Sequence, residues 1–271
     1  MKKKIIAILQ NVALLLYAFY AIFPLVWLII LSFKHDRDMF NTTFIFTPTL
    51  ENYRALFSDG EYIGYFLDNI IVSFGAIALS IVVGVPAAYA LARFDFKGRD
   101  GIAFTFLSFR FAPEILVVLP LFLLYQELGL YDTYVGLIWV FQVLSLPLLI
   151  WILRGYFEDI SVEVENAARL DGYSWWQVFM KIVMPLIRPG LVASALLSLI
   201  FVWNNFTFSL LLAGQDVTTT TVAMLQYVAS DTVHYGQMAG AVLISSLPII
   251  ILALSIQKHL VRGLSMGSVK G

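Results

Sequence analysis

Two side chains of opposite charge, Arg110 and Glu114, stand four residues apart inside an apolar stretch of this chain. A charge at the centre of a membrane-spanning helix costs about 2.5–3.5 kcal/mol on insertion scales, so it usually has a function. Because residues four apart lie on one face of a helix, the spacing predicts that these groups can form an ion pair. The pair would either stabilise the helix or face a cavity and bind hydroxyl groups of a solute. Arg110 could also extend its side chain toward the near end of the stretch.

A second apolar stretch carries aromatic rings beside amides, in the run Phe201-Val202-Trp203-Asn204-Asn205-Phe206. An amide in lipid needs a hydrogen-bond partner, and most asparagines there join neighbouring helices. Rings that stack on the apolar face of a sugar, next to amides that bind its hydroxyls, would also make a sugar site. We therefore treat Trp203, Asn204 and Asn205 as candidate substrate contacts, with Gln142 as a weaker addition.

Motifs for catalysis and cofactor binding do not occur in the sequence. The pattern G-x-x-x-x-G-K-[ST] is absent, so the chain has no P-loop for a nucleotide. His35, His234 and His259 lack the spacing of metal ligands. With 0 cysteines, the chain has neither disulfides nor thiolate ligands. We expect a chain that is not an enzyme and that binds no cofactor or metal itself.

The composition indicates that helices in a membrane position these residues. Hydrophobic residues make up 60% of the chain and charged residues 13%, and the mean hydropathy is +0.85, which excludes an ordinary water-soluble domain. A span takes about 20 apolar residues, and it must be helical because unpaired backbone groups are not tolerated in lipid. We predict an all-α integral membrane protein with one transmembrane domain over residues 1–271. Its six spans are predicted at residues 5–33, 69–92, 102–126, 133–153, 189–215 and 238–257.

Lys and Arg are divided unevenly between the two sides of such a bundle. If the amino terminus is cytoplasmic, 13 of the 17 basic residues lie inside, Lys34, Arg37 and Arg54 lie outside, and Arg110 lies within a span. The positive-inside rule then predicts that both termini are in the cytosol. The first apolar run exceeds the length of a signal-peptide core and no small-x-small cleavage site follows it, so we expect an uncleaved anchor.

The longest inside loop, residues 155–188, contains a predicted helix–turn–helix that we call the elbow, residues 161–184. Ser161 is suited to cap a first helix, Gly172 to end it in a left-handed turn, and Ser174 with Gln177 to form a capping box for a second helix that ends before Pro185. Ala167 and Ala168 would offer another protein a surface with little side-chain bulk, rimmed by the charges of Glu163, Glu165 and Asp171. An amphipathic hairpin lying on lipid headgroups is the alternative.

The spacing within the elbow resembles the coupling loop of ABC importer permeases, which reads E-A-A, three residues, G, nine residues and then I-x-L-P. Ala167-Ala168, Gly172, Ile182 and Pro185 keep that register, whereas Asn166 replaces the glutamate and Met184 the leucine. The whole chain is similar to carbohydrate-uptake permeases of the maltose-importer type, specifically the smaller six-span subunit. The segment Thr49-Leu50-Glu51-Asn52-Tyr53 and the glycine-rich carboxy-terminal tail add to the resemblance.

This resemblance implies half of an ATP-driven importer for a sugar, oligosaccharide or sugar alcohol in the cell membrane of a prokaryote. Its partners would be a second, different permease, two cytosolic ATPase subunits that bind ATP and Mg²⁺, and an external solute-binding protein. Gly267, Val269 and Lys270 of the tail would contact the ATPase. The residues expected to couple to the ATPase are Glu163, Glu165, Asn166, Ala167, Ala168, Asp171, Gly172, Ile182 and Pro185.

A self-contained secondary carrier or channel for a small polar solute is the alternative from another functional class. Such a carrier would need an internal repeat or mid-membrane carboxylates that bind a coupling ion. The predicted spans provide Glu114 alone, and no repeat relates the two halves of the sequence. A dependence of transport on a separate ATPase would distinguish the two hypotheses.

Overall fold

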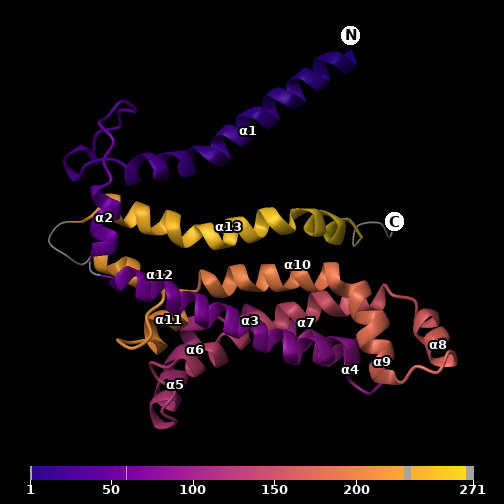
Figure 1. Ribbon diagram of the computed structural model, residues 1–271. Helices are drawn as coiled ribbons and strands as arrows, with labels where there is room; N and C mark the ends of the chain where they lie inside the picture. Colours follow the sequence, from indigo (N-terminus) through magenta and orange to yellow (C-terminus); the bar gives the residue numbers. More distant parts are fainter. Residues whose placement is uncertain (1, 59, 229–232, 267–271) are drawn as a thin grey trace. The chain divides into compact units, whose positions relative to one another are not determined.

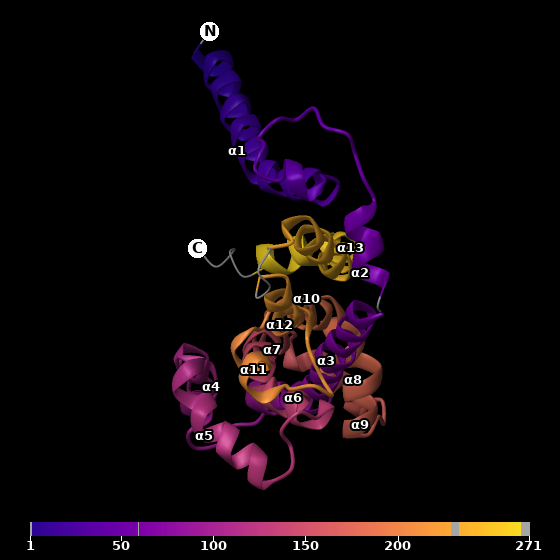
Figure 2. The same cartoon turned by 90° about the vertical axis from the view of Figure 1, so that its left-hand side faces the viewer.

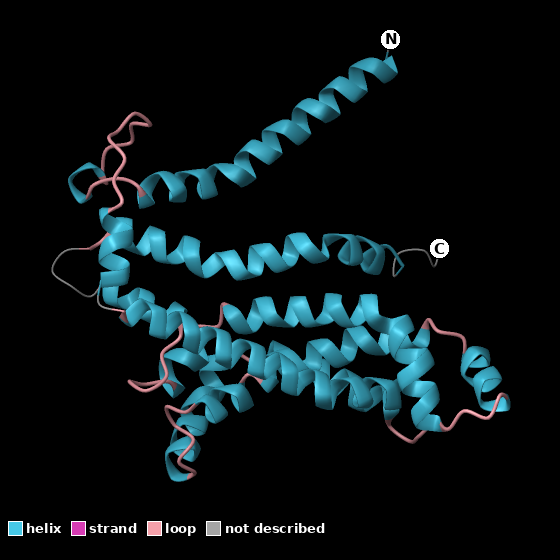
Figure 3. Cartoon of the chain, in the orientation of Figure 1, coloured by secondary structure: helices cyan, strands magenta, loops and turns pink. Residues whose placement is uncertain are grey.

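A computed structural model describes residues 2–58, 60–228 and 233–266, and these residues form helices and loops without strands (Figure 3). The α-helices are α1 (Lys2–Ser32), α2 (Glu51–Ser58), α3 (Glu61–Arg93), α4 (Arg99–Ser108), α5 (Glu114–Glu127), α6 (Tyr134–Val140), α7 (Gln142–Glu158), α8 (Val162–Leu170), α9 (Trp175–Val178), α10 (Met184–Trp203), α11 (Thr207–Leu212), α12 (Thr220–Ala223) and α13 (Tyr235–Met266). Short 3-10 turns are η1 (Asp36–Asp38), η2 (Phe109–Phe111) and η4 (Met224–Tyr227), and η3 (Phe179–Val183) is a π-helical turn. The all-α prediction is confirmed.

The chain forms two compact units, residues 1–64 with 223–247 and residues 65–222 with 248–271. In the first unit, α2 is fastened to the end of α1. The amide of Asn52 donates hydrogen bonds to the carbonyls of Ser32 and Lys34, at 3.0 and 2.8 Å. The hydroxyl of Tyr62 donates to the carbonyl of Ala241 at 2.8 Å, which joins the start of α3 to α13 within the same unit. The sequence predicts one transmembrane domain over residues 1–271, which includes both units. That these units form one domain stays a prediction.

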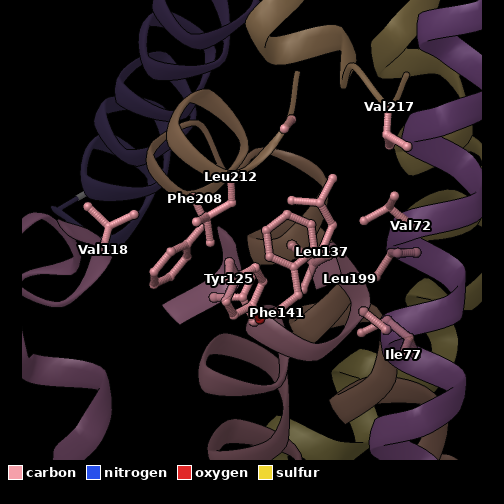
Figure 4. Packing of buried hydrophobic residues seen from close by; sticks show 14 residues of the cluster. Val72, Ile77, Val118, Tyr125, Leu137, Phe141, Leu199, Phe208, Leu212 and Val217 are labelled. Atoms are coloured by element: carbon pink, nitrogen blue, oxygen red, sulfur yellow. The ribbon is translucent and has the colours of Figure 1, made fainter. Parts of the chain in front are cut away.

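The second unit has two hydrophobic cores. Figure 4 shows the first, in which Val72 and Ile77 of α3 meet side chains from α5, α6, α10 and α11. The second core includes Val85 and Tyr89 of α3 and side chains from α7 and from the elbow. Helices α7 and α10 run side by side (Figures 1 and 2). A Cβ atom at Gly190 of α10 would collide with the ring of Tyr156 in α7, so glycine allows the two backbones to approach closely.

The loop after α11 is organised by Asp132, whose carboxylate accepts four backbone N–H groups. Its Oδ1 accepts from Gly214 and Val217 at 2.8 and 2.9 Å, and its Oδ2 accepts from Gln215 and Asp216 at 2.8 and 3.0 Å. Asp132 itself has φ +56°, a left-handed conformation that Asp and Asn adopt more easily than most residues. The start of the segment that follows α11 is therefore held mainly by Asp132, and the carboxylate of Asp68 continues this by accepting the N–H of Thr218 at 3.0 Å.

Four helices among the described residues are long and apolar enough to cross a membrane, and up to six spans result if each of two bent helix pairs counts as one. The pair Arg99–Phe111 and Glu114–Glu127 bends by 92°, and the pair Tyr134–Val140 and Gln142–Glu158 bends by 43°. The span predicted at residues 102–126 thus consists of two helices at nearly a right angle to each other. Ala112 is extended at ψ 128° because a residue before proline, here Pro113, disfavours the helical conformation.

The predicted bounds of the fifth span also differ from the structure. The helix runs from Trp175 to Trp203 and breaks at Asn204, whereas residues 189–215 were expected. The second helix of the elbow was predicted to end before Pro185, and this is wrong. The π-helical turn η3 joins α9 to α10, so that Pro185 lies in the first turn of α10.

Candidate functional site

The elbow has the helix–turn–helix structure that its sequence predicts, and Figure 1 shows α8 and α9 together at one end of their unit. Ser161 caps α8 by accepting a hydrogen bond from the backbone N–H of Glu163 at 3.2 Å. Gly172 ends the first half with φ +92°. Ser174 and Gln177 then form the predicted capping box, with bonds of 3.3 and 2.9 Å between side chain and backbone. Local signals at the caps therefore define this loop.

One face of the elbow is exposed. Leu170 is 90% exposed, an unusual position for a large apolar side chain and a typical feature of a surface that another molecule covers. Ile182 is partly buried at the base of the elbow. The exposed residues among the predicted coupling set are Glu163, Asn166, Ala167, Asp171, Gly172 and Pro185.

Glu165 and Ala168 do not belong to that face, which corrects the prediction that they lie on the surface offered to a partner. Both are buried, because residues three apart on α8 point to the same side of the helix. Glu165 forms an ion pair with Arg93 at the end of α3, with Nε and Oε1 2.5 Å apart, and it accepts a hydrogen bond from the hydroxyl of Tyr89 at 2.6 Å. The charge of Glu165 thus anchors the elbow to α3.

Arg93 and Tyr89 are functional candidates that sequence reasoning missed. Arg93 was counted only as one of the inside basic residues, since nothing in the sequence pairs it with a carboxylate 72 positions away. Its guanidinium also donates to the carbonyl of Ile160 at 2.9 Å, just before α8 begins. The one available signal in the sequence was an arginine at the end of a long apolar span. This pattern indicates where a span leaves the membrane, but it does not identify the residue that the arginine contacts.

Arg110 and Glu114 lie on opposite sides of the break between η2 and α5, so the predicted pairing on one helix face is wrong. The guanidinium of Arg110 instead lies 4.2 Å from the centre of the Phe201 ring in α10. The carboxylate of Glu114 accepts a hydrogen bond from the amide of Asn205 at 3.0 Å. The structure thus brings the two sequence candidates, the charged pair and the amide cluster, to one place that we call the polar junction: Arg110, Glu114, Phe201 and Asn205.

Asn205 occupies the break between α10 and α11 and is largely buried. Besides its bond to Glu114, it accepts a hydrogen bond from the backbone N–H of Phe208 at 3.0 Å and so caps the first turn of α11. Asn204 is exposed and donates to the carbonyl of Ile200 at 2.8 Å. Trp203 is buried, with its ring edge-to-face against Phe66 of α3 at 6.3 Å between centroids.

Gln142, at the start of α7, forms its hydrogen bonds with α3 and α6. Its amide nitrogen donates to the carbonyls of Ala76 and Ile138, at 3.1 and 2.9 Å. Its oxygen accepts from the hydroxyl of Ser80 at 2.6 Å. These bonds satisfy both amide hydrogens, which is typical of a residue that joins helices.

Gly267, Val269 and Lys270 of the tail lie outside the described residues. Within the part of the chain that is described, no three His, Asp or Glu side chains come together in a group that could hold a metal ion.

Comparison with known proteins gives a consistent family. The model of the family described as binding-protein-dependent transport system inner membrane component matches residues 80–266. The trehalose transport system permease protein SugB of Mycobacterium tuberculosis is 34% identical over 256 residues, 93% of each chain. The trehalose/maltose transport system permease protein MalG of Thermococcus litoralis is 33% identical over 270 residues, 97% of each chain.

The fold is also similar to that of a solved transporter. A chain of a bacterial ABC transporter involved in the import of the acidic polysaccharide alginate aligns with a TM-score of 0.80, covering 95% of this chain and 97% of its own. At 23% identity, this likeness concerns the fold alone.

Proposed function

Since the chain belongs to the family of binding-protein-dependent transport system inner membrane components, we propose that it forms half of the pathway of an ATP-driven importer for a sugar, an oligosaccharide or a sugar alcohol. The chain is a multi-pass membrane protein, and its family has permeases rather than catalytic subunits as members. The substrate class rests on relatives named for trehalose and maltose transport. Family membership favours an importer subunit over a self-contained carrier or channel.

The observation that carries the proposal is the elbow, which is firmly attached on one side and exposed on the other. Its exposed face, with Leu170 at the end of α8, would dock into a cleft on a cytosolic ATPase subunit. Two such subunits would bind ATP and Mg²⁺ and hydrolyse the nucleotide, while this chain binds no cofactor itself. The other partners would be a second, different permease and an external solute-binding protein, with both termini of this chain in the cytosol.

Transport would follow from rigid-body switching between two packings of the helices. Closure of the ATPase pair would move the elbow and turn the bundle from inward-open to outward-open, and both ATP and the loaded binding protein would favour the outward state. The tail residues Gly267, Val269 and Lys270 would add a second contact with the ATPase.

The polar junction would contribute to the substrate pathway. Glu114 and Asn205 each have hydrogen-bonding groups that suit sugar hydroxyls, and they lie where two broken helices meet. Trp203 and Asn204 extend the same region, whereas the internal bonds of Gln142 favour a structural role for that residue. Substrate sites of many transporters lie where membrane helices are discontinuous.

The test is reconstitution in sealed vesicles of this chain with a second permease, ATPase subunits and a solute-binding protein from the same cells. Uptake of labelled trehalose, maltose and sugar alcohols is measured with and without internal ATP. We expect uptake of at least one of them to need ATP, the ATPase subunits and the loaded binding protein. Uptake by this chain alone, driven by an ion gradient, would reject the proposal in favour of the carrier.

A further inference from the structure

We infer that Arg93 and Glu165 form the link through which movement of the elbow reaches α3, which makes both of them positioning residues for transport. The inference rests on the proposed function and specifies where displacement enters the helix bundle. We call the two residues, together with Tyr89, the coupler.

The coupler is short and closed to solvent. The side chains of Arg93 and Glu165 are 8% and 4% exposed, and their ion-pairing atoms are 2.5 Å apart. Tyr89, one helical turn earlier on α3, donates its hydroxyl to the second oxygen of Glu165 at 2.6 Å. Arg93 donates in addition to the carbonyl of Ile160 at 2.9 Å. One residue of α3 therefore holds both α8 and the segment that enters it.

Little else on α8 is buried. Of its nine residues, Glu165 and Ala168 are the buried ones, while Val162 and Val164 are 52% and 43% exposed. An exposed ion pair on such a helix would contribute little. A buried pair is different, because removing one partner leaves the other charge without compensation in a place that excludes water. Glu165 is thus the principal polar attachment of α8 to the bundle.

Helix α3 extends from the coupler past both cores of its unit. It contributes Tyr89 and Val85 to the core beside the elbow and Val72 and Ile77 to the other core. Farther along, Phe66 packs against Trp203 beside the polar junction. A displacement that enters at Arg93 consequently acts on the helix whose far part contacts Trp203 through Phe66. It reaches that contact without passing along α10.

The first experiment separates coupling from assembly. In the reconstituted transporter we compare Glu165→Gln, and the double variant Arg93→Met with Glu165→Met, with the native chain. Apolar replacement of both partners of a buried ion pair is often tolerated, so the double variant is expected to assemble. Sugar transported per ATP hydrolysed should fall by at least about fivefold, the lower end of typical coupling between sites. If the double variant does not assemble, the sugar-to-ATP ratio of the more conservative Glu165→Gln variant tests the inference.

The matched control is Glu158→Gln. Glu158 is the carboxylate of another arginine ion pair near the elbow, bonded to Arg154 at 2.8 Å, but both residues belong to α7. Its sugar-to-ATP ratio should stay within about twofold of native, because the pair lies within one helix, Glu158 is 45% exposed, and such pairs contribute little. Equal ratios in the native chain and in the assembled coupler variant would overturn the inference. A native transporter without ATP-dependent uptake would instead reject the proposed function itself.

A cross-link tests the coupler in the opposite direction. The chain has 0 cysteines, so Arg93→Cys with Glu165→Cys provides a unique pair for a short bismaleimide. Before reaction this variant should be uncoupled, and after reaction its sugar-to-ATP ratio should recover, because α3 and α8 are again joined and move together. A ratio that stays low after complete cross-linking, or uptake that is blocked by it, would overturn the inference.

Discussion

Asn205 has a structural role in addition to the substrate contact that we propose for it. Asn205 caps α11 through its side-chain oxygen and holds Glu114 through its nitrogen. Truncation of Asn205 would therefore disturb the break between α10 and α11, with the loss of about 0.5–2 kcal/mol that is typical of a helix cap. Glu114 is the better probe of substrate binding, because glutamine in its place can still accept the hydrogen bond from Asn205.

We predict that Glu114→Gln assembles normally and weakens sugar uptake. A lost hydrogen bond to a charged group is worth about 1.5–3 kcal/mol, so the apparent affinity should fall by roughly ten- to a hundredfold. Concentration-dependent uptake of several sugars measures it, and the size of the loss should differ between sugars. Glu127→Gln, at the exposed end of the same helix, is the control. An unchanged affinity for every sugar would remove Glu114 from the substrate pathway.

Asp132 is a second residue whose charge has a local structural purpose. We predict that Asp132→Asn loosens the loop at residues 214–217, because an amide NH₂ would face backbone N–H groups that the carboxylate now accepts. Each donor left without a partner costs about 1–3 kcal/mol. Hydrogen exchange at these amides should become faster, while Asp216→Asn, an exposed change in the same loop, should leave exchange near native. Equal exchange in both variants would contradict this role.

At the scale of elements, the elbow depends on the turn that joins its two helices. Gly172 has φ +92°, and no atom lies within 4 Å of a Cβ built there. Substitution is therefore opposed by backbone strain rather than by crowding. A β-branched residue is especially unsuited to this conformation, and such strain amounts to about 1–3 kcal/mol. The expected response is a shift of α8 relative to α9.

We predict that Gly172→Val inserts and assembles, but that loaded binding protein no longer stimulates the ATPase fully. With a factor of ten for every 1.4 kcal/mol, stimulation should fall by about five- to a hundredfold. ATP hydrolysis with and without binding protein measures this. Gly155→Val is the control, because this glycine lies in helix α7 and also has open space around its Cβ. Full stimulation in Gly172→Val would reject the elbow as the coupling element.

At the scale of the whole molecule, orientation in the membrane is the property that the charge distribution predicts. We expect Ser58→Cys, at the end of α2, to react with an impermeant maleimide on intact cells, and Lys97→Cys, in the loop between α3 and α4, to react only after lysis. Lys97 is preferable to the neighbouring Gly98, whose φ of +88° disfavours cysteine. Labelling of Lys97→Cys on intact cells would reverse the predicted topology.

Features that depend on residues close together in the chain, such as helix caps, could be predicted from the sequence. Features that depend on contacts between residues far apart in the chain could not. The caps at Ser161 and Ser174 follow from side chains within three residues, and they are confirmed. Pro86, Pro120, Pro147 and Pro248 lie inside helices, whereas Pro113 marks a right-angled break. The sequence does not distinguish these cases, because neighbouring helices decide whether a proline is accommodated. The partners Arg93 and Glu165 are equally invisible, since no periodicity relates α3 to α8.

Helix α10 joins the end of the elbow directly to the polar junction. It contains 20 residues from Met184 to Trp203, which at 1.5 Å per residue correspond to a length of about 30 Å. The elbow ends at its first residue, and Asn204 and Asn205 follow its last. By simple geometry, a tilt of about 8° about one end moves the other by about 4 Å, on the scale of a helical turn. A small stroke at the elbow is therefore sufficient to displace one side of the polar junction.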